Sequence, residues 1–239
     1  MIKKLTINLL ILLAIPCLLY GRNFNVMDFG AQGNGISDDA AAIQKAVDAC
    51  TNAGGGDVVF ASNHVFLSGP VQLKSNVNVV LETNSVWKAN PDESIYHLSA
   101  FGKNEGEGMM WIWAKDVENL SFSGHGTIHG NGIQFMGSEL FDSYELKPVT
   151  TFDPRPHVLT LMGVKNLSIR DITIKEGAYW TVHLIGCDGA VIDGISLLNN
   201  LKIRNGDGID IDHSKHVRIA NCHITSGDDA ICLKNRREY

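Results

Sequence analysis

The sequence of 239 residues is 44% hydrophobic and 19% charged, with 26 acidic residues, 20 basic residues and a formal net charge of −6. This composition is typical of a globular protein and excludes a disordered chain. The acidic balance argues against a nucleic-acid partner, because phosphate binding requires clustered basic residues.

The first 21 residues have the layout of a secretory signal peptide. Basic Lys3 and Lys4 precede an interrupted apolar run from Leu5 to Leu19. A membrane-spanning helix needs about 18 or more clean apolar residues, so we expect cleavage near Gly21 and no stable membrane insertion. Removal of residues 1–21 leaves 18 basic and 26 acidic residues, a net charge of −8. We therefore expect a secreted, periplasmic or cell-surface protein, and a monomer.

Five cysteines are present, and four of them lie beyond the signal segment, at Cys50, Cys187, Cys222 and Cys232. An exported chain could form disulfides between some of these, but the spacing does not identify the pairs. No CxxC spacing occurs, which argues against a structural zinc site. Cys17 leaves a lipid anchor open as an alternative to a cleaved signal.

The segment Asp38 to Cys50 predicts the one clear helix. Its apolar residues follow a helical period, and Ser37 or Asp38 can serve as the N-cap. The glycine cluster at residues 30–35 lacks the βαβ context of a dinucleotide-binding loop and is interpreted as a turn that leads into this helix.

From Asp57 onward, short β-branched runs alternate with Gly, Asn and Asp, which is typical of strands. Three later runs resemble one another when they are aligned on Ile169, Ile192 and Ile219, at intervals of 23 and 27 residues. Repeats of this length without alternating helices indicate a solenoid whose coils stack on one another. The L-x-x-L-x-L ladder of leucine-rich repeats is absent.

We therefore expect residues 22–239 to form an all-β domain, a right-handed parallel β-helix whose first coil is capped by the predicted helix. We also expect this chain to be the front portion of a longer solenoid, because no polar cap follows the last strand-like run. Residues 103–108 and 137–155 break the repeat and are predicted to be long loops beside a binding site.

Two acidic motifs concentrate the chemistry, at residues 205–210 and 226–231. Asp207 and Asp228 are 21 residues apart, close to one coil, so we expect them on the same side of neighbouring coils. Asp229 would join them if Gly227 bends the chain. Parallel strands lie about 4.8 Å apart, which would bring these carboxylates close enough to act on one bond.

The next two aspartates have a simpler interpretation. Asp210 and Asp212 alternate with Ile209 and Ile211. The alternation places the isoleucines inside and the carboxylates outside, where we expect them to be solvated.

The chain resembles the polygalacturonase family of glycoside hydrolases. The resemblance covers essentially everything after the signal segment, and its most specific parts are Asn205 to Asp210 and Gly227 to Lys234. Gly206 stands where the family usually has Thr. The family's later Gly-His-Gly and Arg-x-Lys motifs have no counterpart before Tyr239.

The resemblance implies an enzyme that hydrolyses α-linked galacturonides in pectin, polygalacturonate or rhamnogalacturonan with inversion, without a metal or other cofactor. Asp228 would be the general acid, and Asp207 and Asp229 would activate water. Asn205 and Lys234, which belong to the same motifs, are expected to bind substrate.

Trp180 and His183 lie one coil before Asp207, and we expect them to bind substrate by lining the sugar groove; packing under a loop is the alternative. His213, His216 and His223 are expected to be surface or hydrogen-bonded residues rather than metal ligands.

Two other functions fit the same solenoid. A calcium-dependent pectate lyase would use the aspartates to hold the cation. A carbohydrate-binding β-helix without catalytic activity would need no stacked acids.

Overall fold

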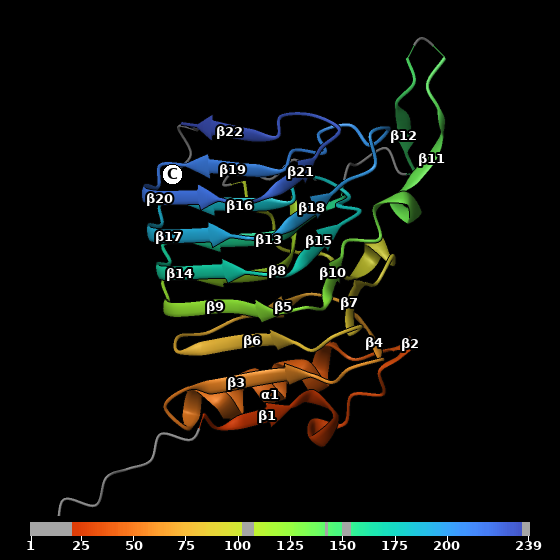
Figure 1. Ribbon diagram of the computed structural model, residues 1–239. Helices are drawn as coiled ribbons and strands as arrows, with labels where there is room; N and C mark the ends of the chain where they lie inside the picture. Colours follow the sequence, from red (N-terminus) through yellow and green to blue (C-terminus); the bar gives the residue numbers. More distant parts are fainter. Residues whose placement is uncertain (1–20, 102–107, 142, 150–153, 236–239) are drawn as a thin grey trace, which may run out of the picture.

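The computed structural model describes residues 21–101, 108–141, 143–149 and 154–235. These residues wind into the predicted right-handed parallel β-helix, in which stacked coils form three sheets (Figure 1). Within the described ranges, no helix combines the length and apolar character that a membrane crossing requires. The predicted signal segment, residues 1–21, lies outside them except for its last residue.

Parallel strand pairing builds each sheet. Sheet 1 contains β1 (Asn23–Asn25), β3 (Gly56–Phe60), β6 (Val77–Leu81), β9 (Glu118–Gly124), β14 (Lys165–Arg170), β17 (Asp188–Asp193) and β20 (Lys215–Ala220). Sheet 2 contains β2 (Asn34–Asp38), β4 (Val65–Ser68), β7 (Val86–Ala89), β10 (Thr127–His129), β15 (Thr173–Lys175), β18 (Ser196–Leu198) and β21 (His223–Thr225). Sheet 3 contains β5 (Val71–Gln72), β8 (Met109–Lys115), β13 (Pro156–Met162), β16 (Val182–Ile185), β19 (Ile209–Asp212) and β22 (Ile231–Lys234).

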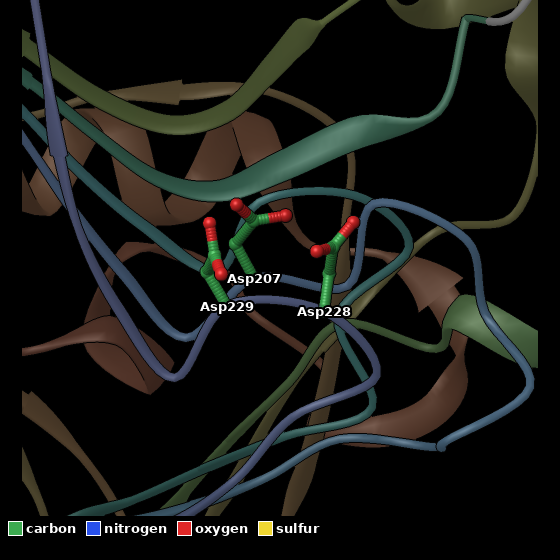
Figure 2. A group of neighbouring side chains, drawn as sticks. All are labelled: Asp207, Asp228 and Asp229. Carbon is green, nitrogen blue, oxygen red and sulfur yellow. The ribbon is translucent and has the colours of Figure 1, made fainter.

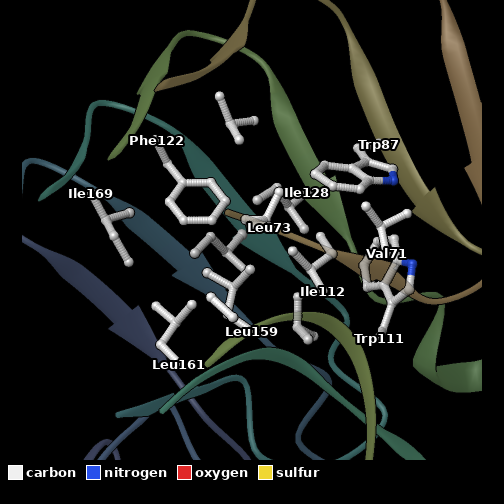
Figure 3. Packing of buried hydrophobic residues seen from close by; sticks show 14 of the residues in the cluster. Val71, Leu73, Trp87, Trp111, Ile112, Phe122, Ile128, Leu159, Leu161 and Ile169 are labelled. Carbon is white, nitrogen blue, oxygen red and sulfur yellow. The ribbon is translucent and has the colours of Figure 1, made fainter. Parts of the chain in front are cut away.

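The residues that were aligned in the predicted sequence repeat are pairing partners in neighbouring strands of sheet 1. Ile169 pairs with Ile192, which in turn pairs with Ile219. Apolar side chains at such matched positions stack along the axis, and Figure 3 shows part of this core, including Phe122 and Ile169. Burial of each large apolar side chain contributes about 1.5–3 kcal/mol, so the continuous stack is the main stabilising element.

The first coil is capped by α1 (Ala40–Asn52), whose buried face is Ala42, Ile43, Ala46, Val47 and Cys50, as the helical period predicts. The predicted N-cap is wrong by one residue, because Asp39 occupies that position. The Asp38 carboxylate still accepts a hydrogen bond from the Ala40 amide at 2.8 Å. The Asp39 carboxylate instead accepts from the Gln32 and Gly33 amides, which fixes the preceding turn.

The predicted loop at 137–155 contains a hairpin of β11 (Met136–Glu139) and β12 (Leu146–Pro148), which projects from the solenoid (Figure 1). Most of the predicted loop at 103–108 lies outside the described residues. Three short 3-10 helices occur: η1 (Val26–Phe29), η2 (Glu93–Ile95) and η3 (Gly132–Phe135). The four cysteines in the described ranges are free thiols.

A column of residues with positive φ forms the bend into sheet 1: Gly55, Asn76, Asn119, Asn166, Gly189 and His216. Asparagine tolerates the left-handed region better than other residues with a side chain. The Asn119 amide donates a hydrogen bond to Asn76 Oδ1 at 2.8 Å, and its Oδ1 accepts one from Asn166 at 3.2 Å. The column therefore connects three coils at one bend.

Asn119→Ala should lower the free energy of unfolding by about 1–3 kcal/mol, because alanine is strained at this φ of 55° and makes neither hydrogen bond. Asn119→Gly removes the same hydrogen bonds without the strain, so its loss should be smaller. Urea denaturation measures both values. Equal losses would show that the backbone conformation contributes nothing at this bend.

Candidate active site

The predicted catalytic aspartates lie just before two neighbouring strands of sheet 3. Asp207 precedes β19, and Asp228 and Asp229 precede β22. Ile209 pairs with Ile231, a register of 22 residues, so Asp229 and not Asp228 stacks directly on Asp207. The Gly208 amide also donates to the Asp229 carbonyl at 2.9 Å. Asp228 is therefore displaced by one residue along the chain, which gives it a different position from the stacked pair.

Glycines allow these two turns to pack against each other. A Cβ atom on Gly208 would lie 2.4 Å from the Ala230 carbonyl oxygen, and one on Gly227 would lie 2.7 Å from that of Ile203. The Gly227 amide donates to the Gly206 carbonyl at 3.2 Å. The predicted bend at Gly227 is present, and close backbone contact is the physical reason that a glycine is required there.

The three carboxylates gather on one side of these turns (Figure 2). Each offers one oxygen that lies within 4.8 Å of the others. Asp207 is buried, at 2% exposure, whereas Asp228 and Asp229 are exposed. One buried carboxylate and two exposed ones can together hold a water molecule and donate a proton.

Lys234 brings a positive charge to this acidic site. Its Nζ atom lies 3.0 Å from Asp207 Oδ2 and 3.1 Å from Asp210 Oδ1. Burial raises the pKa of Asp207 above its usual value, and the charge of Asp228 adds to this, while Lys234 opposes the rise. For Lys234, burial works against the charged form, but the two aspartates raise its pKa above the usual lysine value. The ammonium is therefore firmly charged.

The expectation that Asp210 and Asp212 are solvated is wrong, because both are completely buried. Ile209 does point into the core, as predicted, but the outer face of sheet 3 is covered here by other side chains. Asp212 Oδ1 lies 2.6 Å from His213 Nδ1. Alternation along a strand predicts which side of the sheet a side chain occupies, and it does not predict whether that side is open to water.

Trp180 and His183 lie beneath this surface. Trp180 is 6% exposed, and the ammonium of Lys234 lies 4.4 Å from its ring centroid. His183 is completely buried, with Nε2 3.6 Å from Asp212 Oδ2 and Nδ1 3.3 Å from His157 Nδ1. In this conformation both rings contact protein groups, and a sugar could touch His183 only after its neighbours moved.

Asn205 adopts a left-handed conformation, with φ of 55°. Its side-chain oxygen lies 3.5 Å from Nη2 of Arg155, a fully buried residue that the sequence did not single out. Arg155 Nη1 also donates to the carbonyls of Ala178 and Arg204, at 3.0 and 2.6 Å. Arg155 thus fixes the turn that leads into Asp207. Its position at the end of an irregular loop gave no sign of this burial.

Asn199 also supports this turn and was not predicted. Its amide nitrogen lies 2.6 Å from Thr181 Oγ1, 3.2 Å from the Gly206 carbonyl oxygen and 3.5 Å from that of Asp207. Among the described residues, Asp207, Asp228 and Asp229 are also the one group of acidic, His or Cys side chains that could hold a metal ion. Of the three histidines noted in the sequence, His213 contacts Asp212 and His216 contacts Asp188.

Comparison with known proteins gives the family. The model of glycosyl hydrolases family 28 matches residues 50–238, which include both acidic motifs. The chain belongs to this family. A polygalacturonase of Persea americana is 29% identical over 220 residues, which cover 89% of this chain and 44% of the relative. The chain spans less than half the length of the first curated relatives that it matches.

Solved structures agree on the architecture. A polygalacturonase from Erwinia carotovora ssp. carotovora is 26% identical and superimposes with a TM-score of 0.69, over 84% of this chain and 56% of that one. A hyperthermoactive exopolygalacturonase from Thermotoga maritima superimposes with a TM-score of 0.75 at 24% identity, over 90% and 55% of the two chains. The latter likeness supports the fold alone.

The burial of Asp210 predicts how stability depends on pH. Burial and the neighbouring Asp207 charge raise the pKa of Asp210 from 3.8 to about 8, against the opposing effect of Lys234. Between these values the folded protein keeps a proton that the unfolded chain releases. The contribution of Asp210 to stability is therefore complete below about pH 4 and is lost as the pH rises to about 8.

Asp210→Asn cannot titrate, so its free energy of unfolding should decline less than that of the wild type between pH 4 and pH 8. Urea denaturation at several pH values measures both declines. Asp171→Asn, at an exposed position, is the matched control and should follow the wild type. Parallel declines in all three proteins would contradict the assignment of a raised pKa to Asp210.

Proposed function

We propose that the protein is a polygalacturonase-like glycoside hydrolase that cleaves α-linked galacturonide bonds in pectin by inverting acid/base hydrolysis. The observation that carries the proposal is the group of three carboxylates, from two neighbouring coils, with oxygens within 4.8 Å of one another. Membership of family 28 and the polygalacturonases among its relatives support the same chemistry.

The proposed roles follow from the difference between the stacked pair, Asp207 and Asp229, and the displaced Asp228. Asp228, exposed and displaced from the stacked pair, donates a proton to the leaving oxygen as the general acid. Asp207 and Asp229, stacked on each other, hold and activate the water. The ammonium of Lys234 beside Asp207 favours the ionised form of that carboxylate, which a base requires.

The substrate in this proposal is an acidic plant polysaccharide, and the protein acts outside the cytoplasm after export by its first 21 residues. The apolar run behind Lys3 and Lys4 supports export. An acidic protein needs local positive charge to hold a polyanion, so the cations around the site matter more than the net charge.

Asp207→Asn, Asp228→Asn and Asp229→Asn should each lower kcat on polygalacturonate by about a hundredfold or more, because each removes a positioned acid or base. Release of reducing ends by the full product of the gene measures this, with circular dichroism to verify the fold. Asp171→Asn, an exposed aspartate outside the site, is the matched control and should retain the wild-type rate.

The same assay separates the two competing functions. Loss of activity with EDTA and products that absorb in the ultraviolet would indicate a calcium-dependent lyase instead. Binding of polygalacturonate without new reducing ends would indicate a binding β-helix. Near wild-type rates for Asp228→Asn would refute the assignment of the general acid.

Inverting hydrolysis predicts that the first reducing end formed has the opposite anomeric configuration from the bond that was cleaved, because water attacks from the face opposite the leaving group. Proton NMR during the first minutes, before mutarotation, measures the anomer. Retention of configuration would contradict the proposed mechanism and would mean that one aspartate attacks the sugar directly.

A further inference from the structure

Three consecutive coils meet around the ammonium of Lys234. Lys234 lies at the end of β22, Asp207 and Asp210 come from the preceding coil, and Trp180 comes from the coil before that. The Nζ atom lies 3.0 Å from Asp207 Oδ2 and 3.1 Å from Asp210 Oδ1, and 4.4 Å from the Trp180 ring centroid. Lys234 thus contacts the proposed catalytic base Asp207 and two further residues, Asp210 and Trp180.

This arrangement differs from the surface ion pairs of the chain. The side chains of Asp207 and Asp210 are 3% and 0% exposed, and that of Lys234 is 20% exposed. Lys202 and Glu139, by comparison, are each about half exposed. Exposed pairs contribute little, whereas a buried carboxylate that loses its cation is left uncompensated. Lys234 is therefore tightly held, and little of it faces solvent.

We infer that Lys234 is a positioning residue for Asp207 rather than a substrate-binding residue, and that Asp210 and Trp180 hold its ammonium in place. The inference rests on the proposed function, in which Asp207 helps to activate water. Lys234 lies against Asp207 Oδ2, which limits the orientations of this carboxylate within the group that it forms with Asp228 and Asp229. An ionised base in a fixed orientation is what a water-activating site requires.

The protonation state of Asp210 determines the net charge of the group that Asp207, Asp210 and Lys234 form. Two ionised aspartates and one lysine would leave a buried net charge of −1, which is costly in a site of low polarity. Burial and the Asp207 charge raise the pKa of Asp210 to about 8, so this carboxyl keeps a proton at neutral pH. The positive charge of Lys234 is then compensated by Asp207 alone, and Asp210 contributes a polar contact.

Trp180 is the other residue that holds the ammonium of Lys234. Its ring faces the ammonium and is itself packed against Phe101, with ring centroids 5.5 Å apart. A cation above an indole face is stabilised by the electrons of the ring, most strongly where water is excluded. The ring that was predicted to stack on a sugar thus stabilises the lysine that holds the base.

The test compares Lys234→Met, which keeps the length of the side chain without its charge, with Lys234→Arg, which keeps the charge. Lys165→Met, at an exposed lysine, is the matched control and should behave as the wild type. Lys234→Met should lower kcat by about 10- to 100-fold with KM changed less than about threefold, because it impairs the base and not the sugar contacts. Lys234→Arg should recover part of this loss. A large rise in KM with kcat retained would overturn the inference and indicate substrate binding.

A second measurement does not depend on activity. In a double-mutant cycle of Lys234→Met and Asp207→Asn, thermal unfolding should show that removing the lysine lowers the Tm less when Asp207 is already neutral. Additive Tm changes would show that the two groups do not interact and would overturn the inference. If the Tm changes are coupled but the protein does not hydrolyse polygalacturonate, the contact between Lys234 and Asp207 is established and the proposed function is refuted.

Discussion

The register between β19 and β22 is the constraint on which the site depends. Parallel strands place residues of successive coils at fixed positions above one another, and here the pairing of Ile209 with Ile231 stacks Asp229 on Asp207. A shift of one residue in this pairing would turn β22 over relative to β19, and Asp229 would no longer stack on Asp207. Ile209 is completely buried in the core, and its pairing with Ile231 therefore fixes the relative position of the acids.

Glycines make the same stacking possible at the turns. At Gly208 and Gly227 an added Cβ would lie within 3 Å of a backbone carbonyl oxygen of the neighbouring coil. The turns can therefore approach each other more closely than turns with side chains could. This close approach brings a stacked pair and an adjacent third acid together, and it also explains how two consecutive residues, Asp228 and Asp229, serve one site.

A second property of the site is that several of its charged groups are buried. Asp207, Asp210 and Asp212 are all buried, the last two on the outer face of sheet 3, and each has a cationic or imidazole neighbour within 4 Å. Such groups contribute little net stability, because desolvation offsets much of the attraction. A site that needs a carboxylate of fixed orientation and a lysine of fixed charge gives a functional reason for their burial.

The sequence alone determined the solenoid, the capping helix, the repeat through Ile169, Ile192 and Ile219 and the location of the three acids, because periodicity, glycine turns and local motifs are properties of neighbouring residues. It predicted that Gly227 bends the chain, and the structure has that bend. Only the tertiary structure decided that Asp229 stacks on Asp207, that Asp210 and Asp212 are buried, and that Arg155 and Asn199 hold the turn that leads into Asp207. These features depend on the register between coils and on which side chains cover the outer face of a sheet. Both are set by contacts between residues about 20 to 50 positions apart, as in the pairing of Ile209 with Ile231 and the contact of Arg155 with Arg204. No local pattern carries that information.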